Sequence, residues 1–269
     1  MTQTTSAVRS LSARRALVTG SSAGLGLSIA EGLAAAGCDI ALHGLEAPEA
    51  MAPVIQSLQA QYGVRVVYVR SDLSRLEGIE ALHSQVCLEL GPPDILVNNA
   101  VVRHFGALED LRFEDWQLAL NVNLSAAFGL IQRVLPAMRS QRFGRILQMT
   151  SVYGLRGTTQ RVDYVTTKTA LIGLTRAVAA ETVTDGITSN AVCPGSVLTP
   201  GTDGRVQDLM TTRGISREEA EAIFLQGKQP SQRFVRAEDV AASVVFLCGP
   251  AARDITGQVL PIEGGWSAM

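Results

Sequence analysis

Short runs of β-branched and apolar residues alternate with longer amphipathic stretches along almost the whole chain, and this alternation restricts the fold more than any other feature. A repeated strand–helix–strand order predicts a parallel sheet covered by helices on both faces, with right-handed crossovers. The expected strands are Ala16–Thr19, Asp39–Leu42, Val64–Arg70, Ile95–Asn98, Arg145–Met149, Thr188–Val192 and Val259–Pro261. The expected helices lie near 24–36, 48–62, 75–90, 114–139, 163–184 and 237–247.

Length and composition favour a single domain for this pattern. The 269 residues contain no internal repeat or linker, and 46% apolar against 18% charged residues are enough for a full core. We therefore expect an α/β fold with a doubly wound (Rossmann) sheet of seven parallel strands over 14–269, after a flexible leader at 1–13. Segment 198–233 breaks the alternation and carries four glycines and a helical piece near 217–224. It is expected to form a small lid.

The same numbers argue against several classes of partner. A formal net charge of −2 provides no overall basic field for nucleic acid. Four widely separated cysteines and three histidines lack metal-ligand spacing, so we expect free thiols, a cytoplasmic location and no metal. The first residues lack the apolar segment of a signal peptide, and no apolar run is expected to span a membrane.

A glycine-rich turn, Thr19-Gly20-Ser21-Ser22-Ala23-Gly24-Leu25-Gly26, follows the first expected strand and precedes a helix. Glycines at such a junction let the backbone approach a pyrophosphate, which the helix N-terminus can then face. An ordinary tight turn would look similar, but the position at the first junction of a doubly wound pattern favours a dinucleotide site. Asn98-Asn99-Ala100, at the end of the fourth strand, fits the same crevice.

The residues after the second and third strands bear on which dinucleotide binds. Enzymes selective for NAD often place an acidic residue after the second strand, whereas this chain has Gly44, with Glu46 two residues later. No Arg or Lys stands at Ala23 or just after Gly44 to hold a ribose phosphate, so NAD is favoured over NADP. Asp72 either accepts from the adenine amino group or caps the helix that begins near Ser74.

Tyr164 and Lys168 are four residues apart, which places them on one face of an expected helix. A free tyrosine has a pKa of about 10, and a nearby cation favours the phenolate that acid–base catalysis needs. Ser151 could hold the substrate oxygen beside the tyrosine hydroxyl. Asn123 could hold a water through its amide and feed a proton relay, or it could be a buried Asn that bends a helix. A surface helix pair would also give the Tyr–Lys spacing, so the prediction rests on the combination.

With these residues the chain resembles the short-chain dehydrogenase/reductase family. The resemblance runs from about Arg14 to the C-terminus and is carried by Gly20, Gly24, Gly26, Asn98-Asn99-Ala100, Asn123, Ser151, Tyr164, Lys168 and Pro194-Gly195. It implies oxidoreduction of an alcohol or ketone, a homotetramer, and Ser151, Tyr164, Lys168 and Asn123 as the catalytic set. The cofactor contacts that it implies are Gly20, Ser22, Gly24, Leu25, Gly26, Gly44, Asp72, Leu73, Asn99, Ala100, Tyr164, Lys168, Pro194, Gly195, Val197 and Thr199. Val101 departs from the Gly usual in the family and could narrow the space near the nicotinamide ribose.

Within that family the chain looks most like bacterial D-3-hydroxybutyrate dehydrogenases, in stretches 35–44, 186–195, 228–231, 245–248 and 264–266. Those enzymes use NAD with a Gly where an acidic ribose ligand could stand. They hold a small monocarboxylate with a Gln, a His, a Lys and a second Gln. The matching positions here are Arg103, Tyr153, Arg161 and Arg205, with Ser196 where a Trp is expected, and the resemblance also places Trp266 at the substrate.

These departures predict a small anionic hydroxy or keto acid whose tail is larger or more anionic than that of 3-hydroxybutyrate, such as a second carboxylate, a phosphonate or a sulfonate. Alternatively, one or two of the arginines point to solvent or pair with Glu109, Asp163 or Asp203. Two other functions stay open. One is NADPH-dependent reduction of a 3-oxoacyl thioester or bulky ketone, and the other is a non-catalytic dinucleotide sensor.

Overall fold

The computed structural model describes residues 9–268, so most of the leader expected at 1–13 lies outside the described residues. The described end of that leader is not a loose tail. Leu11 is buried in the core, and its backbone N–H donates to the carbonyl of Ala36. The expected boundary at residue 13 is therefore too late, because an apolar side chain at position 11 packs at the end of the first helix.

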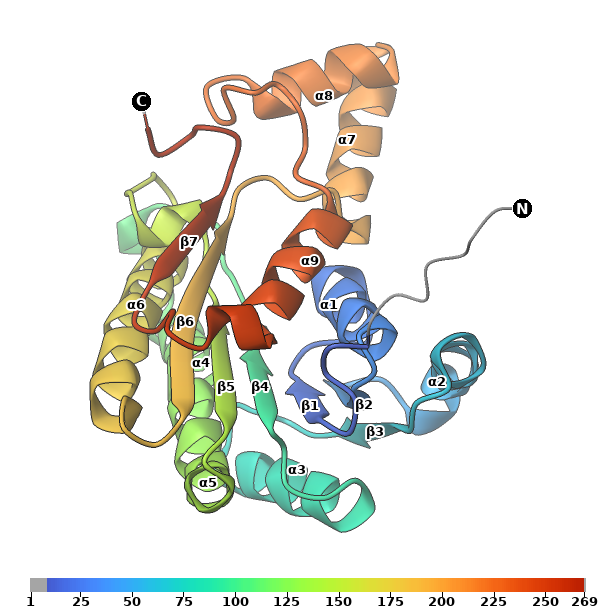
Figure 1. The fold of residues 1–269 in the computed structure, drawn as a ribbon. Helices are drawn as coiled ribbons and strands as arrows, with labels where there is room; N and C mark the ends of the chain where they lie inside the picture. Colours follow the sequence, from blue (N-terminus) through green and yellow to red (C-terminus); the bar gives the residue numbers. More distant parts are fainter. Residues whose placement is uncertain (1–8, 269) are drawn as a thin grey trace.

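The described residues form one sheet of seven parallel strands in the order β3-β2-β1-β4-β5-β6-β7 (Figure 1). The order reverses at β1, and in doubly wound sheets such a reversal opens a crevice at the carboxyl ends of the strands. The predicted fold class is confirmed, with strand ends shifted by a few residues. The strands are β1 (Arg15–Val18), β2 (Asp39–Gly44), β3 (Val66–Arg70), β4 (Ile95–Asn98), β5 (Gly144–Met149), β6 (Ile187–Pro194) and β7 (Val259–Ile262).

Two layers of helices cover the sheet because successive strand side chains point to opposite faces. In β1, Ala16 and Val18 belong to one core and Leu17 to the other. The first core is covered by α1 (Gly24–Ala35), α2 (Pro48–Tyr62) and α9 (Ala237–Cys248). The second is covered by α3 (Leu76–Glu89), α5 (Ala126–Gln141) and α6 (Val162–Thr182). Short 3-10 turns lie at η1 (Leu108–Asp110), η3 (Val152–Gly154) and η4 (Pro250–Ala252).

The helix expected at 114–139 is not continuous. It consists of α4 (Phe113–Leu120), a π-helical turn η2 (Asn121–Ser125) and α5. By length and composition alone, Phe113–Gln141 is apolar enough to cross a membrane, which the sequence pattern does not predict. Its apolar side chains Leu130, Val134 and Met138 are buried in the second core, so packing against the sheet accounts for them.

The expected lid contains two helices, α7 (Pro200–Arg213) and α8 (Arg217–Leu225), of which the sequence predicts only the second. Gly201 and Gly204 have low helix propensity, so the sequence does not predict α7. Its ends nevertheless carry ordinary signals, because Thr199 caps the N-terminus before Pro200, and Gly214 ends the helix with a φ of +62°. The two helices project beyond the carboxyl ends of β6 and β7 (Figure 1).

Candidate active site

A pocket of about 430 Å³ lies at the carboxyl edge of the sheet, beneath the lid. The glycine turn, the ends of β4, β5 and β6, the start of α6 and the lid all contribute to its wall. Among the residues predicted from the sequence, the pocket brings together Ser151, Tyr164 and Lys168 with all six substrate candidates, Arg103, Tyr153, Arg161, Ser196, Arg205 and Trp266.

Tyr164 and Lys168 lie one turn apart on α6, and Ser151 follows β5 as the cap of η3. The Lys168 side chain is buried, and its Nζ donates to the carbonyl of Met149 at 2.6 Å. The same Nζ lies 5.6 Å from the centre of the Tyr164 ring. Burial, with a smaller contribution from the charge of Arg103, lowers the pKa of Lys168 to about 7. This places an ammonium that titrates near neutral pH beside the ring of Tyr164.

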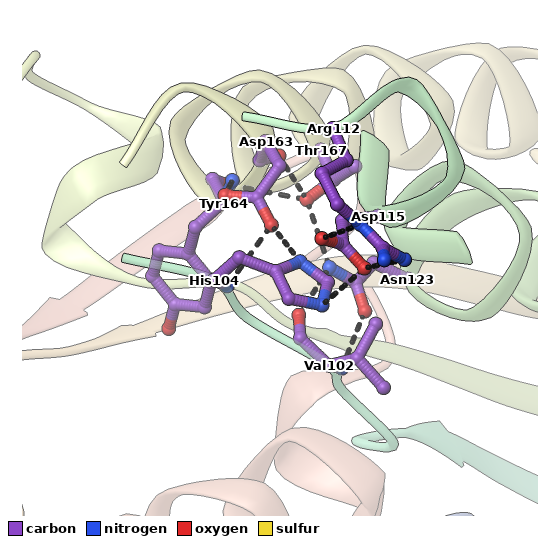
Figure 2. Close-up of polar contacts among 8 residues, drawn as sticks. All are labelled: Val102, His104, Arg112, Asp115, Asn123, Asp163, Tyr164 and Thr167. Carbon is purple, nitrogen blue, oxygen red and sulfur yellow. Dashed lines mark hydrogen bonds and ion pairs between the residues drawn. The ribbon is translucent and has the colours of Figure 1, made fainter. Parts of the chain in front are cut away.

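Asn123 does not line the pocket, and its amide is occupied by protein groups (Figure 2). Its Nδ2 donates to the carbonyl of Val102 at 2.9 Å and to Oγ1 of Thr167 at 3.1 Å, and its Oδ1 accepts from the N–H of Val102 at 2.8 Å. Both amide hydrogens are therefore used. The side chain thereby joins segment 101–103 to α6, and the expected water relay at Asn123 stays a prediction.

Asp163, on α6, also connects this helix to the segment after β4 through its contacts with His104 (Figure 2). Its buried carboxylate accepts from the backbone N–H of His104 at 3.1 Å and lies 2.9 Å from Nδ1 of the same residue. The other carboxylate oxygen accepts from the N–H of Tyr164. Nε2 of His104 lies 3.8 Å from Asp115, which pairs with Arg112. The sequence does not predict a role for His104, because residues 59 positions apart leave no local pattern.

The three arginines do not make the alternative pairs considered from the sequence. Among the described residues, Asp163 pairs with His104, Asp203 pairs with Arg217, and Glu109 makes no ion pair. Arg161 instead lies over the ring of Phe105, with its Cζ 3.4 Å from the ring centre. Its Nη1 is buried and has no hydrogen-bond partner. Burial and the neighbouring charge of Arg103 lower the pKa of Arg161.

The glycine turn has the geometry of an anion cradle. Helix α1 begins at Gly24 without a side-chain cap, so its first N–H groups stay free for a ligand. A Cβ at Gly26 would collide with the carbonyl oxygen of Gly20, so only glycine fits there. The Nδ2 of Asn99 donates to that carbonyl at 2.9 Å and holds the turn. The candidate cofactor contacts that line the pocket are Gly20, Gly24, Leu25, Gly26, Asn99, Ala100, Pro194, Gly195, Val197 and Thr199, with Tyr164 and Lys168.

The remaining candidate contacts, Ser22, Gly44, Asp72 and Leu73, do not line this pocket. Asp72 accepts from the N–H of Ser74 at 2.9 Å, and this bond is the largest cause that lowers its pKa. Asp72 thus closes a turn before α3 without being its N-cap, since that position belongs to Arg75. Its side chain is exposed and can still accept from a further donor. Leu73 is buried in the second core.

Glu46 folds back over Gly44, where many dinucleotide enzymes have an acidic residue. Its Oε2 accepts from the N–H of Leu45 at 3.0 Å and lies 3.4 Å from the hydroxyl of Tyr68. A Cβ at Gly44 would collide with this oxygen, so the glycine makes room for the carboxylate. Partial burial opposes ionisation, but hydrogen bonds from the backbone, Ser22 and Tyr68 hold the pKa of Glu46 below its ordinary value. The sequence locates Glu46 near this site but does not place its side chain.

Lys228 is a pocket residue that the sequence does not predict. It comes from the loop after α8 and lines the pocket with Phe224. Its position in a loop carries no helical or strand periodicity, so no sequence signal directs it toward the pocket. No group of three or more His, Cys, Asp or Glu in the described part of the chain is arranged to hold a metal.

Known proteins resemble this chain over nearly its full length. The family model described as enoyl-(acyl carrier protein) reductase matches residues 20–267. D-beta-hydroxybutyrate dehydrogenase of Cupriavidus necator is 39% identical over 259 residues, which cover 96% of this chain and 100% of the relative. A 3-oxoacyl-(acyl-carrier-protein) reductase of Staphylococcus aureus is 34% identical, with 94% and 97% covered. L-sorbose reductase of Gluconobacter frateurii, solved with NADPH and L-sorbose, has a TM-score of 0.92 at 30% identity, with 97% and 99% covered.

Proposed function

The chain belongs to the short-chain dehydrogenase/reductase family and is an oxidoreductase acting on hydroxyl groups, and we propose that it interconverts a 3-hydroxy acid and the matching 3-oxo acid with NAD. One observation carries the proposal. The pocket that holds Ser151, Tyr164 and Lys168 is also lined by unpaired cations, and in the described part of the chain no Asp or Glu lines it. Such a pocket fits an anionic substrate whose hydroxyl reaches the tyrosine.

The catalytic roles follow from the placement of the three side chains. When bound, the nicotinamide ring supplies or accepts the hydride at the substrate carbon. The phenolate of Tyr164 takes the proton from the alcohol, and the protonated hydroxyl returns it to the ketone, while the hydroxyl of Ser151 orients the reacting oxygen. In its protonated form, Lys168 favours the phenolate of Tyr164. Asn123 acts as a positioning residue, because its amide joins the segment carrying Arg103 to the helix carrying Tyr164.

The acid group of the substrate is assigned to Arg161. This guanidinium lies 5.6 Å from the centre of the Tyr164 ring and has a buried nitrogen without a partner. A carboxylate can accept two parallel hydrogen bonds from it while the hydroxyl of the same molecule reaches Tyr164. Ser196 contributes a small side chain to the wall, which supports a substrate with a larger tail than 3-hydroxybutyrate. Arg103 and Arg205 support a more anionic one.

The assignment of NAD depends on Glu46. Its carboxylate lies beside Ser22 and Gly44 at the end of β2, where it can accept from ribose hydroxyls. The phosphate on the ribose of NADP would be repelled by the same charge. Glu46→Gln should therefore shift the preference between the two cofactors roughly tenfold toward NADP. Glu49→Gln, which removes an exposed charge three residues away, is the matched control.

The test is a substrate and cofactor screen followed by absorbance at 340 nm. We expect turnover of 3-hydroxy acids with NAD, and a higher kcat/KM for acids larger or more anionic than 3-hydroxybutyrate. A preference for 3-hydroxybutyrate would remove the substrate proposal. A wild-type preference for NADP, or an unchanged preference in the Glu46 variant, would remove the cofactor proposal.

A second candidate function is NADPH-dependent reduction of a 3-oxoacyl thioester or another ketone. The 3-oxoacyl reductase of Staphylococcus aureus and the L-sorbose reductase of Gluconobacter frateurii, which was solved with NADPH, are relatives that favour it. The carboxylate of Glu46 and the cationic pocket argue against it, and turnover of a neutral thioester with NADPH in the same screen would support it. A non-catalytic sensor would bind a dinucleotide without turning over any substrate. A homotetramer and a cytoplasmic location stay predictions.

A further inference from the structure

Two lid residues, Arg205 on α7 and Lys228 after α8, bring positive charge to one aromatic ring. The Cζ of Arg205 lies 5.2 Å from the centre of the Phe224 ring, and the Nζ of Lys228 lies 4.2 Å from it. Phe224 is itself fixed by Phe234, with ring centres 5.5 Å apart. All three side chains Arg205, Phe224 and Lys228 line the pocket. We call this group the lid cation pair.

Neither member of the lid cation pair is neutralised within the described residues. The guanidinium of Arg205 donates to two neutral oxygens of its own helix, on Gly201 and Thr202, and Lys228 donates to the carbonyl of Phe224. A guanidinium has five N–H groups and an ammonium has three, so both keep donors for a ligand. Burial is the main cause that lowers the pKa of Arg205 and of Lys228, and neighbouring cations lower both further.

One carboxylate on the substrate does not account for this arrangement. Arg161, beside Tyr164, can already bind a carboxylate through two parallel hydrogen bonds. The lid cation pair would then remain half-buried and unpaired, and unpaired charges away from water are unfavourable. A second negative group, reaching from the reacting carbon toward Phe224, would satisfy it.

The charges next to the lid cation pair place it on the substrate side of the pocket. The charge of Arg161 contributes to the lowered pKa of Lys228. The pKa of Arg205 is lowered by the charge of Arg103 and raised by Tyr153. Tyr153 packs edge-on against Tyr164, with ring centres 6.4 Å apart. The lid cation pair therefore faces the substrate side, whereas the expected pyrophosphate position is the start of α1.

We propose that Arg205 and Lys228, over the ring of Phe224, form a second anion subsite, and that the substrate is a hydroxy acid carrying two separate negative groups. The proposal rests on the proposed function for the position of the first anion at Arg161. The second group is an oxyanion, which a carboxylate, a sulfonate or a phosphonate would supply. When this oxyanion binds, it neutralises the charges of Arg205 and Lys228 and holds α7 and α8 over the substrate.

The first experiment compares 3-hydroxyglutarate with its monomethyl ester, a pair that differs by one negative charge at the same chain length. We expect the wild-type kcat/KM for the diacid to exceed that for the ester roughly 10- to 100-fold. Arg205→Met and Lys228→Met should each bring this ratio close to one. Arg213→Met, which removes an exposed charge from the same helix α7, should preserve it. The 4-sulfonate and 4-phosphonate analogues of 3-hydroxybutyrate identify the preferred oxyanion.

A ratio near one in the wild type, or an unchanged ratio in both lid variants, would overturn the subsite and leave the proposed function standing. A second measurement needs no turnover. Glutarate should raise the Tm of the wild type more than that of either lid variant, and it should do so with NAD at saturation. If no hydroxy acid is turned over but this difference persists, the proposed function fails and the subsite survives. If NAD abolishes the effect of glutarate, the lid cation pair binds the cofactor and the subsite is wrong.

Discussion

Replacing Lys168 with Met should abolish turnover and at the same time stabilise the folded protein. Burial, followed by the charge of Arg103, lowers the pKa of Lys168 from 10.5 to about 7 in the folded state. At 1.36 kcal/mol per pKa unit, that difference corresponds to about 5 kcal/mol of destabilisation at pH 7. The Met variant loses the hydrogen bond to the carbonyl of Met149, which costs about 1–3 kcal/mol. A net gain of about 2–4 kcal/mol in the free energy of unfolding remains.

The pH dependence separates this effect from a change in packing. A packing change alone would alter the free energy of unfolding by the same amount at every pH. Between pH 7 and 10.5, the unfolded wild-type chain holds a proton on Lys168 that the folded chain has released. The free energy of unfolding of the wild type therefore rises through this window by about 1.4 kcal/mol per pH unit from this group. The Met variant has no such group. Its advantage should shrink at each step from pH 7 to pH 9 and disappear before the unfolded lysine titrates.

Urea unfolding of the cofactor-free protein at pH 7, 8 and 9 measures this difference, because every other titrating group is common to both proteins. Arg213→Met serves as a control for loss of one positive charge, since Arg213 is exposed and should show no pH-dependent difference over this range. A Lys168 variant that is no more stable than the wild type at pH 7 would refute the reasoning. A stability difference that stays constant from pH 7 to 9 would also refute it.

Two further substitutions test the proton-transfer residue and its support. Tyr164→Phe should keep its affinity for NAD but lose roughly 10²–10⁴-fold in kcat, because only the hydroxyl is removed; full turnover would exclude Tyr164 from the chemistry. Asp163→Asn should lower the free energy of unfolding by about 1–3 kcal/mol, because the carboxylate that accepts from two groups of His104 is lost. It should also raise the KM for the acid by loosening the segment that carries Arg103. An unchanged KM alongside lower stability would make the contact structural only.

Local periodicity was enough to predict the architecture. The alternation of β-branched runs and amphipathic stretches predicted the sheet, because burial on both faces imposes that composition on each strand. The spacing of Tyr164 and Lys168 predicted their shared helix face for the same local reason. Where the sequence failed, the signal was ambiguous or absent. Glycines obscured α7, and the π-helical turn at 121–125 was indicated only by the alternative that Asn123 bends the helix.

The charge environment of the site was decided by the tertiary structure. Arg161 and Lys228 are 67 positions apart in the chain, and only the return of the lid over the sheet edge brings both to one pocket. The partner of Asp163 was likewise His104 and not an arginine. The sequence by itself determined the fold class and the reaction, because both depend on spacings within single elements or at strand ends. The substrate pocket depends on contacts between elements, and their geometry comes from the sheet order and the packing of the lid, which no local spacing records.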